Sequence, residues 1–418
     1  MKKTITVLGM GYIGLPTALL LADVGNEVFG FDIDNRKIEK LKKGMLPFEE
    51  KGLKSLFDRV LTKNTFSPVS KIEKSGIFLI AVPTPQKNAH CDLSFIIQAL
   101  DSIKDVFEEG NLLVVESTVG PTDCEEKIIP EIKKFGRKFH FAYCPERAIP
   151  GDTLSEMVIN ARIIGGINKE DAILAKEIYS TFVTGDVFTT DLKVASACKL
   201  MENTFRDVNI ALANEFALIA DEIGFDVWKA IELANKHPRV NIHQPGPGVG
   251  GHCIPIDPWF FVGESSKSIL IKKARETNNE MPLYVCQKVK KLIKKFKIYK
   301  PIIGILGYSY KKNVDDFRET PAEQIITNLS KDYKVLVNDP YIKNPPIKMV
   351  NLQTLLTKSE VLVLVTDHDC YKEISFKKYP QINFVYDTRN FLQENNTKES
   401  NIKIYKLGEG SNENIDCY

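Results

Sequence analysis

The chain has 418 residues, of which 43% are hydrophobic and 26% are charged, and its formal net charge is +2 at pH 7. This composition is typical of a globular protein with two or three domains, and the near-neutral charge favours neither a nucleic-acid partner nor a membrane surface. The sequence opens directly into an apolar strand pattern without a signal peptide, and no apolar run reaches about 18 residues. The eight cysteines include no CxxC pair. We therefore expect a cytoplasmic protein with reduced thiols and no metal site.

The first 32 residues carry the pattern of a dinucleotide-binding fold. The apolar run Thr4–Leu8 leads into G-M-G-Y-I-G at residues 9–14 and then into a helical pattern. In such a unit the first glycine allows the tight turn, the second lets backbone N–H groups approach a pyrophosphate, and the third lets the helix pack on the strand. A second predicted strand, Glu27–Phe31, ends at Asp32, whose carboxylate would hold the ribose hydroxyls of NAD and repel the 2′-phosphate of NADP. We therefore predict NAD as the cofactor.

Later apolar strands in this half each run into a polar loop. Three predicted strands share the pattern: residues 77–82, 112–116 and 139–143. They lead to Thr84, to Thr118 and to the pair Glu146 and Arg147. Open parallel sheets bind ligands at the carboxyl ends of their strands, so the two threonines could contact the cofactor. Ordinary strand-end threonines and a surface ion pair are the alternatives.

Residues 191–224 predict one long helix with Asp191 as its N-cap and Gly224 just past its end. At 1.5 Å per residue it would span about 48 Å. Apolar residues lie on more than one of its faces, which indicates burial by the chain's own domains or by a second subunit. Lys199, Asn203 and Arg206 share one stripe, and a partly buried lysine there could transfer protons. A solvated polar stripe is the alternative.

Residues 237–258 read HPRVNIHQPGPGVGGHCIPIDP, in which proline and glycine alternate from Pro245 to Gly248. So many of these residues cannot form a helix or a strand interior, so we expect a shaped loop that approaches a ligand closely. Cys253 on this loop is a candidate nucleophile, although a lone cysteine is more often a buried structural residue. A zinc site at His252 and Cys253 is unfavourable because no further ligands have suitable spacing.

After Pro301 the pattern of a second α/β unit begins. Its glycine turn, Gly307–Lys311, lacks GxGxxG, so this unit could hold a different nucleotide. The residues after Asn390 are polar and predict a short, loosely ordered tail. The sequence thus predicts the α/β class, with two Rossmann-like, doubly wound parallel-sheet domains joined by a central helical domain that contains the long helix. The predicted boundaries are residues 1–190, 191–298 and 299–418.

Motifs along nearly the whole chain resemble one known family. In chain order they are GxGxxG, AVPTP, EST, CPER, KLMENTFRDVN, NKHPRVN, GPGVGGHCIPIDP and KKNVDDFRETPA. This order resembles the UDP-glucose/GDP-mannose dehydrogenase family, which implies an NAD-binding domain, a helical dimerising middle and a UDP-sugar-binding domain. ENTFRDVNIALANE and NKHPRVNIHQPGPGVGGHC are most similar to the members that oxidise UDP-N-acetyl-D-mannosamine. UDP-glucose-specific members usually have a serine before the nucleophile and Lys-Asp after it, where this chain has His252 and Ile256-Asp257.

The resemblance implies roles for individual residues. Cys253 would be the nucleophile, and Lys199 would be the proton donor and acceptor beside it. The implied NAD contacts are Tyr12, Ile13, Asp32, Thr84, Thr118 and Arg318. The implied UDP-sugar contacts are Arg147, Ala148, Lys199, Asn203, Arg206, His237, Arg239, Gly250, Tyr310 and Lys311. Glu146 and Asp257 are candidates for handling the hydrolytic water, and the implied homodimer would let Arg239 reach the active site of a partner subunit.

The expected reaction is the four-electron oxidation of the C6 hydroxyl of a UDP-N-acetylhexosamine, foremost UDP-N-acetyl-D-mannosamine. It would use two NAD per sugar, pass through a Cys253 thiohemiacetal and thioester, and supply surface polysaccharide biosynthesis. The same reaction on UDP-N-acetylglucosamine, UDP-N-acetylgalactosamine or UDP-glucose is an alternative. A single-hydride dehydrogenase of the β-hydroxyacid or 6-phosphogluconate type, with Cys253 structural, is another alternative, and an NAD-binding sensor without turnover is a third.

Overall fold

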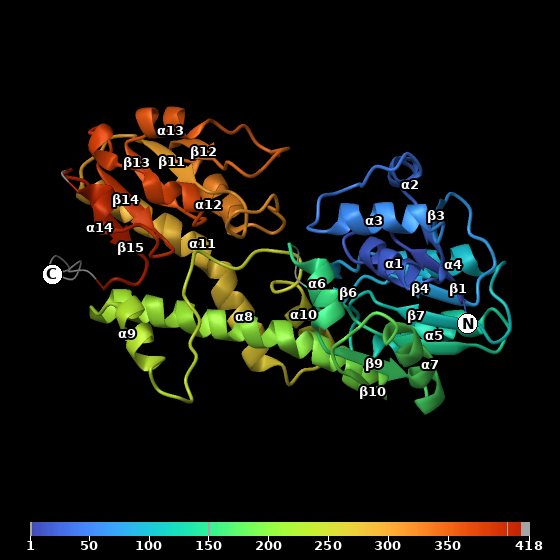
Figure 1. Ribbon diagram of the computed structural model, residues 1–418. Helices are drawn as coiled ribbons and strands as arrows, with labels where there is room; N and C mark the ends of the chain where they lie inside the picture. Colours follow the sequence, from blue (N-terminus) through green and yellow to red (C-terminus); the bar gives the residue numbers. More distant parts are fainter. Residues whose placement is uncertain (1, 149–150, 399, 411–418) are drawn as a thin grey trace. The chain divides into compact units, whose positions relative to one another are not determined.

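The computed structural model describes residues 2–148, 151–398 and 400–410 (Figure 1). The chain divides into two units, each with its own sheet. The first unit comprises the residues up to Glu202 together with Trp259–Lys267, and the second comprises Asn203–Pro258 together with the residues from Ser268 onward. The expected three-domain boundaries at residues 190 and 298 stay a prediction.

The first unit is built on an eight-stranded sheet with the order β10-β9-β8-β7-β4-β1-β2-β3. Its strands are β1 Thr4–Leu8, β2 Glu27–Phe31, β3 Phe66–Val69, β4 Ile77–Ile80, β7 Leu112–Val115, β8 His140–Tyr143, β9 Arg162–Gly166 and β10 Val187–Asp191. A short hairpin, β5 Gln86–Lys87 and β6 His90–Cys91, follows β4. Neighbouring strands of the sheet pair in parallel except β8 and β9, which are antiparallel. The predicted Rossmann-like sheet is confirmed, with that one pair as the departure among the described strands.

Helices cover both faces of this sheet. They are α1 Gly14–Asp23, α2 Asn35–Lys42, α3 Leu53–Thr62, α4 Ser94–Ile103, the π-helical turn η1 Cys124–Ile128, α5 Ile129–Lys133, α6 Thr153–Ile159 and α7 Lys169–Tyr179. Residues of α1, α2, α3 and α7 share one core with the alternate strand residues Ile5, Val7 and Val114. On β4, Ile77 and Leu79 belong to this core, whereas Phe78 between them packs against Phe107, which follows α4. Burial on both faces explains why β4 and β7 read as unbroken apolar runs.

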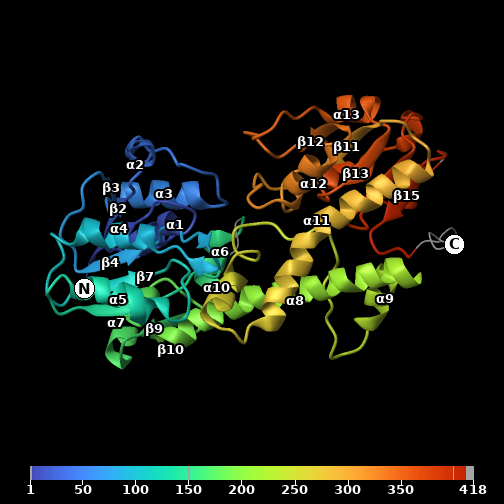
Figure 2. The same cartoon turned by 180° about the vertical axis from the view of Figure 1, so that it is seen from behind.

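Four helices follow β10, and the two long ones, α8 and α11, contribute most of their residues to the second unit. The helices after β10 are α8 Leu192–Ile223, α9 Val227–Ala234, α10 Asp257–Glu264 and α11 Ile269–Lys295. The predicted ends of α8 are confirmed, because the Val194 N–H donates to Asp191 Oδ1 at 2.8 Å and Gly224 has a φ of +89°. Asp226 caps α9 by accepting N–H groups of its first turn. Helix α11 leaves the side of α8 and continues to the C-terminal sheet (Figure 2). Among the described residues, none of the helices has the length and apolarity that crossing a bilayer requires.

The C-terminal sheet has five parallel strands in the order β12-β11-β13-β14-β15. They are β11 Ile302–Leu306, β12 Lys334–Asn338, β13 Val361–Leu364, β14 Phe384–Asp387 and β15 Lys403–Lys406. The helices are α12 Pro321–Leu329, α13 Leu352–Lys358 and α14 Glu394–Thr397, with 3₁₀ segments η2 Asp369–Glu373 and η3 Phe376–Lys378. The second predicted Rossmann-like sheet is therefore confirmed.

The prediction of a loosely ordered tail after Asn390 is wrong as far as residue 410. Helix α14 and strand β15 lie in that segment, and β15 pairs in parallel with β14. Ile402 and Leu407 are buried, and Asn396 donates hydrogen bonds to the carbonyls of Lys372 and Ile374. These few apolar and amide anchors order a segment whose composition is otherwise polar. The remaining tail residues, 411–418, lie outside the described residues.

Both sheets hold their glycine turn in the same way. Asp32, after β2, accepts the Met10 N–H of the turn after β1 at 2.9 Å. Asp339, after β12, accepts the N–H groups of Tyr308 and Ser309 at 2.7 and 2.8 Å. An aspartate at the end of the second strand thus fixes the turn after the first strand in each sheet.

The Asp339 carboxylate also receives a hydrogen bond from a buried histidine. His368 Nδ1 accepts the Asn313 N–H at 2.9 Å, so its Nε2 carries the proton and donates to Asp339 Oδ2 at 2.9 Å. Burial raises the pKa of Asp339, but the hydrogen bonds from His368, Ser309 and Tyr308 outweigh burial and lower it to about 2. The ionised carboxylate is therefore part of the folded structure.

We predict that Asp339→Asn lowers the free energy of unfolding by about 2 kcal/mol at pH 7. A carboxyl group whose pKa is lowered on folding contributes stability above its unfolded pKa, and this contribution is lost as the pH falls towards about 2. Thermal unfolding of both proteins between pH 7 and 3 measures the difference, which should shrink in the acid range. The exposed Asp332, paired with Lys290, provides the control Asp332→Asn, which should cost less than about 1 kcal/mol. A difference for Asp339→Asn that does not change with pH contradicts the prediction.

Candidate active site

The glycine turn after β1 has the shape that a dinucleotide requires. Gly9 has a φ of +101°, and a Cβ there would lie 2.4 Å from the Ala81 carbonyl oxygen. A Cβ on Gly14 would lie 1.9 Å from the Gly9 carbonyl oxygen, so α1 starts directly against the turn. A Cβ on Gly11 would meet nothing within 4 Å, which leaves open space above the N-terminus of α1. The residues of this turn therefore fit a pyrophosphate at the helix N-terminus.

Asp32 is 6% exposed and has several partners. Besides the Met10 N–H, its carboxylate accepts the Asp34 N–H at 2.8 Å and pairs with Lys37 at 2.9 Å. Lys37 lies on α2 and was not singled out from the sequence. The predicted contact of Asp32 with a ribose, and the exclusion of a 2′-phosphate, stay predictions.

The predicted NAD residues of the first unit follow neighbouring strands. They are Tyr12 and Ile13 after β1, Asp32 after β2, Thr84 after β4 and Thr118 after β7. Thr84 is buried, and the exposed Tyr12 ring packs on Phe48 with centroids 4.3 Å apart. The Ser117 hydroxyl joins the last two loops, because it donates to the Val82 carbonyl at 2.7 Å and accepts the Val82 N–H at 2.9 Å. The topology thus brings all five residues to one edge of the sheet.

The CPER loop after β8 is held by two ion pairs. Glu146 pairs with Arg162 of β9 at 2.6 Å, and both side chains are buried. Its other oxygen accepts the N–H groups of Arg147 and Ala148 at 2.7 and 2.9 Å. The Arg147 guanidinium contacts both carboxylate oxygens of Glu202 on α8, at 2.6 and 3.0 Å. Glu146 and Arg147 are thus not an isolated surface pair, and both oxygens of Glu146 have partners.

A second buried carboxyl group lies near Arg162. Glu116, which directly follows β7, accepts the Tyr179 hydroxyl at 2.6 Å and the Thr17 hydroxyl at 3.1 Å. Burial raises the pKa of Glu116 to about 7, although the Arg162 charge opposes this shift. Two carboxyl groups therefore share the field of one guanidinium beneath the CPER loop.

Lys199 lies on the buried side of α8. It is 8% exposed, and within the described part of the first unit its ammonium has neither a hydrogen-bond nor an ion-pair partner. A buried cation without a partner is unfavourable, which is typical of a group that meets its partner in a ligand. Its role in proton transfer stays a prediction.

In the second unit the Cys253 loop packs against the turn after β11. The Gly251 N–H donates to the Arg318 carbonyl at 2.9 Å. Gly251 has a φ of +93°, and a Cβ there would lie 2.9 Å from Cε2 of Tyr310. A Cβ on Gly250 would lie 2.6 Å from the Tyr310 Cβ. The Cys253 side chain is exposed, so the loop presents a thiol beside two residues that were predicted to contact the ligands.

Asp257 fixes the other end of the Cys253 loop. The Asp257 N–H donates to the Cys253 carbonyl at 2.9 Å, and its carboxylate accepts an N–H of Asn203 at 2.6 Å. Both side chains are buried. Asn203 was predicted to contact the sugar, and the structure adds a contact between Asn203 and the turn that follows Cys253.

The other predicted sugar-nucleotide residues are on the surface. Arg206, His237, Arg239 and Lys311 are all exposed. Burial and the nearby Arg206 charge lower the pKa of His243. The His237 ring accepts the Arg239 N–H at 3.3 Å. The contacts of these residues with a substrate stay predictions.

Several polar residues around this loop were missed from the sequence. They are Asp207 and Asn214 on α8, Arg275 and Asn278 on α11, and Arg389 after β14. The Arg389 Nη1 would lie 2.7 Å from a Cβ on Gly246, and its Nε donates to the Val365 carbonyl at 3.1 Å. Asp207 and Asn214 lie seven residues apart on α8, and this spacing was the available signal for those two residues.

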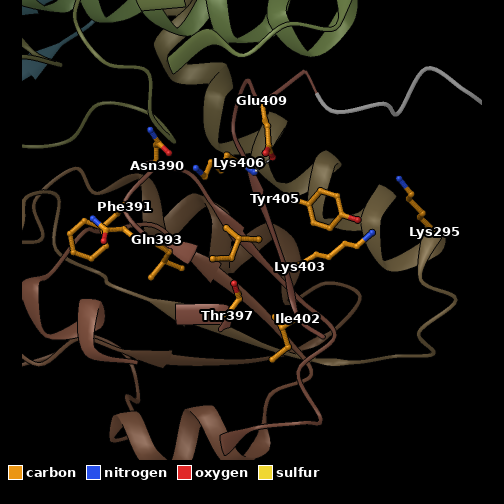
Figure 3. Close-up of a pocket in the computed structure, with 12 residues that line it drawn as sticks. Lys295, Asn390, Phe391, Gln393, Thr397, Ile402, Lys403, Tyr405, Lys406 and Glu409 are labelled. Atoms are coloured by element: carbon orange, nitrogen blue, oxygen red, sulfur yellow. Dashed lines mark hydrogen bonds between the residues drawn. The ribbon is translucent and has the colours of Figure 1, made fainter. Parts of the chain in front are cut away.

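A hollow of about 870 Å³ lies elsewhere in the second unit, beside β15. Figure 3 shows Lys403, Tyr405 and Lys406 of β15 in it, with Lys295 of α11 and with Glu409. None of the predicted site residues lines it. Glu409 accepts the Lys406 N–H at 3.1 Å, so it caps an outward-facing group of this edge strand. The lysines and this cap are typical of a protected sheet edge.

Comparison with known proteins assigns the three parts of the chain. Residues 3–183, 193–280 and 304–394 match the UDP-glucose/GDP-mannose dehydrogenase family models for the NAD binding domain, the central domain and the UDP binding domain. The UDP-N-acetyl-D-mannosamine dehydrogenase of Methanococcus vannielii is 44% identical over 98% of both chains. The NDP-N-acetyl-D-galactosaminuronic acid dehydrogenase of Ralstonia nicotianae is 40% identical over 93% of this chain and 96% of its own. The structure of the UDP-D-ManNAc dehydrogenase from Pyrococcus horikoshii superposes with a TM-score of 0.91 at 36% identity, over 97% and 99% of the two chains.

We predict that Gly251→Ala lowers kcat by roughly 10- to 100-fold, because the new Cβ and the positive φ would displace the loop that carries Cys253. NAD binding, measured by fluorescence titration, should change by less than about 2-fold, since the glycine turn of the first unit is untouched. Gly44→Ala is the matched control. Gly44 has a φ of +72° and open space around it, so this change brings the same backbone cost without moving Cys253. Equal kcat losses in both variants contradict the prediction.

Proposed function

This chain belongs to the UDP-glucose/GDP-mannose dehydrogenase family, and we propose that it oxidises the C6 hydroxyl of a UDP-N-acetylhexosamine to a carboxylate. It is an NAD-dependent oxidoreductase of nucleotide sugars. The observation that carries the four-electron proposal is the exposed Cys253 thiol, on a loop held against Tyr310 and Arg318. A dehydrogenase that stops at the aldehyde or ketone would not need this thiol.

The first oxidation requires a group that takes a proton from the C6 hydroxyl. When bound, NAD supplies the hydride acceptor, one molecule for each of two oxidations. Lys199 is the proposed proton acceptor: its neutral amine would take the proton, and the buried ammonium formed in this way would stabilise negative charge on the C6 oxygen. Asn203 can assist, because an amide NH₂ has two N–H donors and one of them is directed at Asp257. Each such donor is worth roughly a few kcal/mol in other enzymes.

The Cys253 sulfur then adds to the aldehyde carbon. A C–S bond forms and the aldehyde oxygen takes a proton, which gives a thiohemiacetal on Cys253. Its carbon still carries one hydrogen, so it can lose a hydride and the hydroxyl a proton, which gives a thioester. The thiol thus keeps the aldehyde bound for the second oxidation.

Hydrolysis completes the proposed reaction. Water adds to the thioester carbonyl, the C–S bond breaks, and the sugar leaves as a carboxylate while the sulfur is released. Asp257 is the proposed group near the water, because it lies four residues from Cys253 and its N–H contacts the Cys253 carbonyl. Glu146 is the second candidate, and its pair with Arg162 argues for a role through Arg147 and Ala148 instead.

UDP-N-acetyl-D-mannosamine is the proposed sugar nucleotide. The relatives with 44–45% identity over 97–98% of this chain carry that substrate in their name, whereas the Ralstonia relative is named for N-acetyl-D-galactosaminuronic acid. Residues His252 and Ile256 also differ from the pattern expected for UDP-glucose. A cytoplasmic location and a role in surface polysaccharide biosynthesis belong to the same proposal.

We predict two NADH per sugar with UDP-N-acetyl-D-mannosamine, because both hydrides leave C6 before the product is released. The absorbance of NADH at substrate exhaustion, together with the mass of the product, measures this ratio. UDP-N-acetylglucosamine, UDP-N-acetylgalactosamine and UDP-glucose should give kcat/KM values lower by about 10-fold or more. One NADH per sugar would establish the single-hydride alternative. If none of the four sugar nucleotides gives NADH, the NAD-binding sensor without turnover is the alternative that remains.

The second test removes the thiol. Cys253→Ala should abolish formation of the acid, whereas Cys370→Ala, which removes another exposed thiol of the second unit, should retain activity. A fully active Cys253→Ala enzyme contradicts the covalent route.

A homodimer is part of the proposed function, and α8 supports it. Four large apolar residues of its second-unit segment share one stripe and are exposed: Phe205 by 60%, Leu212 by 41%, Ile219 by 37% and Ile223 by 67%. A stripe of this length on a long helix fits a second copy of the same helix, and such isologous contacts are the commonest in homodimers. We propose that Arg239, exposed after α9, then reaches the partner's active site.

We predict that Leu212→Glu dissociates the dimer and lowers kcat by about 10-fold or more, because Arg239 would lose its target. Sedimentation velocity measures the mass, and NADH release measures activity on the same samples. Ile173→Glu is the matched control, since Ile173 on α7 is also 41% exposed and lies off the stripe. A wild-type protein that is monomeric and fully active contradicts both the dimer and the role of Arg239.

A further inference from the structure

A chain of buried polar side chains connects α11 to α8 in the second unit. Arg275 pairs with Asp207, and the Asn278 amide donates to Asp207 Oδ1 at 2.8 Å. Asn214 Nδ2 donates to Asn278 Oδ1 at 2.8 Å, and Asn214 Oδ1 accepts the Gly246 N–H at 2.8 Å. The four side chains are at most 2% exposed. The network therefore ends on the backbone of the loop that leads to Cys253.

Hydrogen-bonding chemistry fixes the orientation of both amides in this network. A backbone N–H can only donate, so Asn214 must direct its Oδ1 at Gly246 and its NH₂ at Asn278. The Asp207 backbone carbonyl can only accept, and it lies 3.0 Å from the Asn278 amide, so Asn278 must direct its NH₂ at Asp207 and its Oδ1 at Asn214. The donors and acceptors along the network can therefore be arranged in only one way, which favours a single geometry of these side chains.

Helix α8 also holds the far end of the Cys253 loop. Asn203 donates to Asp257 after Cys253, and Asn214 accepts from Gly246 before it. The two asparagines lie about three helical turns apart on α8. The loop between Gly246 and Asp257 is thus hydrogen-bonded to one helix at two points, and the Arg389 guanidinium lies beside Gly246.

We propose that Asn214 and Asn278 are positioning residues for Cys253. They act through the Gly246 backbone, which sets where the loop starts relative to α8. This inference rests on the proposed function of Cys253. A loop that shifts by about 1 Å can lose on the order of 100-fold in rate, which is large enough to measure.

The experiment uses Asn214→Leu in the full-length enzyme, because leucine has a similar size and makes neither hydrogen bond. We expect kcat to fall by roughly 10- to 100-fold while KM for NAD changes by less than about 2-fold. Iodoacetamide labelling without sugar, read by mass spectrometry, should change the ratio of Cys253 to Cys370 modification by about 3-fold or more. Cys370 is exposed and serves as the internal reference thiol.

Tyr284→Phe is the matched control. It removes the 2.6 Å hydrogen bond from Tyr284 on α11 to Asp221 on α8, which links the same two helices away from the Cys253 loop. This variant should lower the melting temperature and leave both kcat and the labelling ratio unchanged. If Asn214→Leu does not fold, Asn214→Ser and Asn278→Leu are assayed in the same way.

Two outcomes overturn the positioning role. One is a folded Asn214 variant that has a lower melting temperature but wild-type kcat and labelling ratio. The other is an equal kcat loss in Tyr284→Phe, which would show a general effect of loosening the helix pair. The labelling ratio needs no turnover, so it tests the inference even if wild-type enzyme oxidises none of the UDP-sugars, an outcome that would overturn the proposed function alone.

Discussion

The second unit depends on the buried ion pair between Asp207 and Arg275, which joins α8 to α11. Burial raises the pKa of Asp207 against the Arg275 charge and the Asn278 hydrogen bond, so desolvation offsets much of the attraction. Apolar residues of similar size could stabilise the two helices as well. An ion pair adds direction, because it fixes the donors and acceptors of Asn278 and therefore of Asn214. The pair thus contributes geometry at the loop before Cys253 more than it contributes stability.

The two sheets hold the glycine turn after their first strand with the same kind of contact. In each, an aspartate after the second strand accepts N–H groups of the turn after the first, and in each the turn begins with a glycine at positive φ. The third partner of the carboxylate differs. Asp32 pairs with Lys37 at the surface, whereas Asp339 is buried with His368. The first turn keeps open space above Gly11, whereas the second sends Tyr310 against the Cys253 loop. The same framework therefore holds a cofactor turn in one sheet and supports the proposed nucleophile in the other.

Local patterns were enough to predict much of the fold. The ends of α8 followed from Asp191 and Gly224, and the first turn followed from three glycines whose Cβ positions are blocked or open as expected. The segment after Asn390 could not be predicted from its polar composition, because its order comes from the pairing of β15 with β14 and from the burial of Ile402 and Leu407. The same holds for the candidate site. The sequence motifs singled out their own residues, but they gave no signal for Arg162, Asn214 and Asn278. The contacts of these three residues are with partners that are distant in the sequence.

The Arg162 cluster explains how a carboxylate can remain buried under the CPER loop. Two ionised carboxylates around one guanidinium would leave a net negative charge in a dry interior, which is costly. A pKa of about 7 lets Glu116 keep a proton near neutral pH, so that Arg162 serves Glu146 alone. Glu146 accepts the N–H groups of Arg147 and Ala148 with the oxygen that does not pair with Arg162. As the pH rises above 7, Glu116 ionises and competes for the guanidinium, and the hold on the CPER loop weakens. The raised pKa of Glu116 thus limits the negative charge that is buried beside Arg162 below about pH 7.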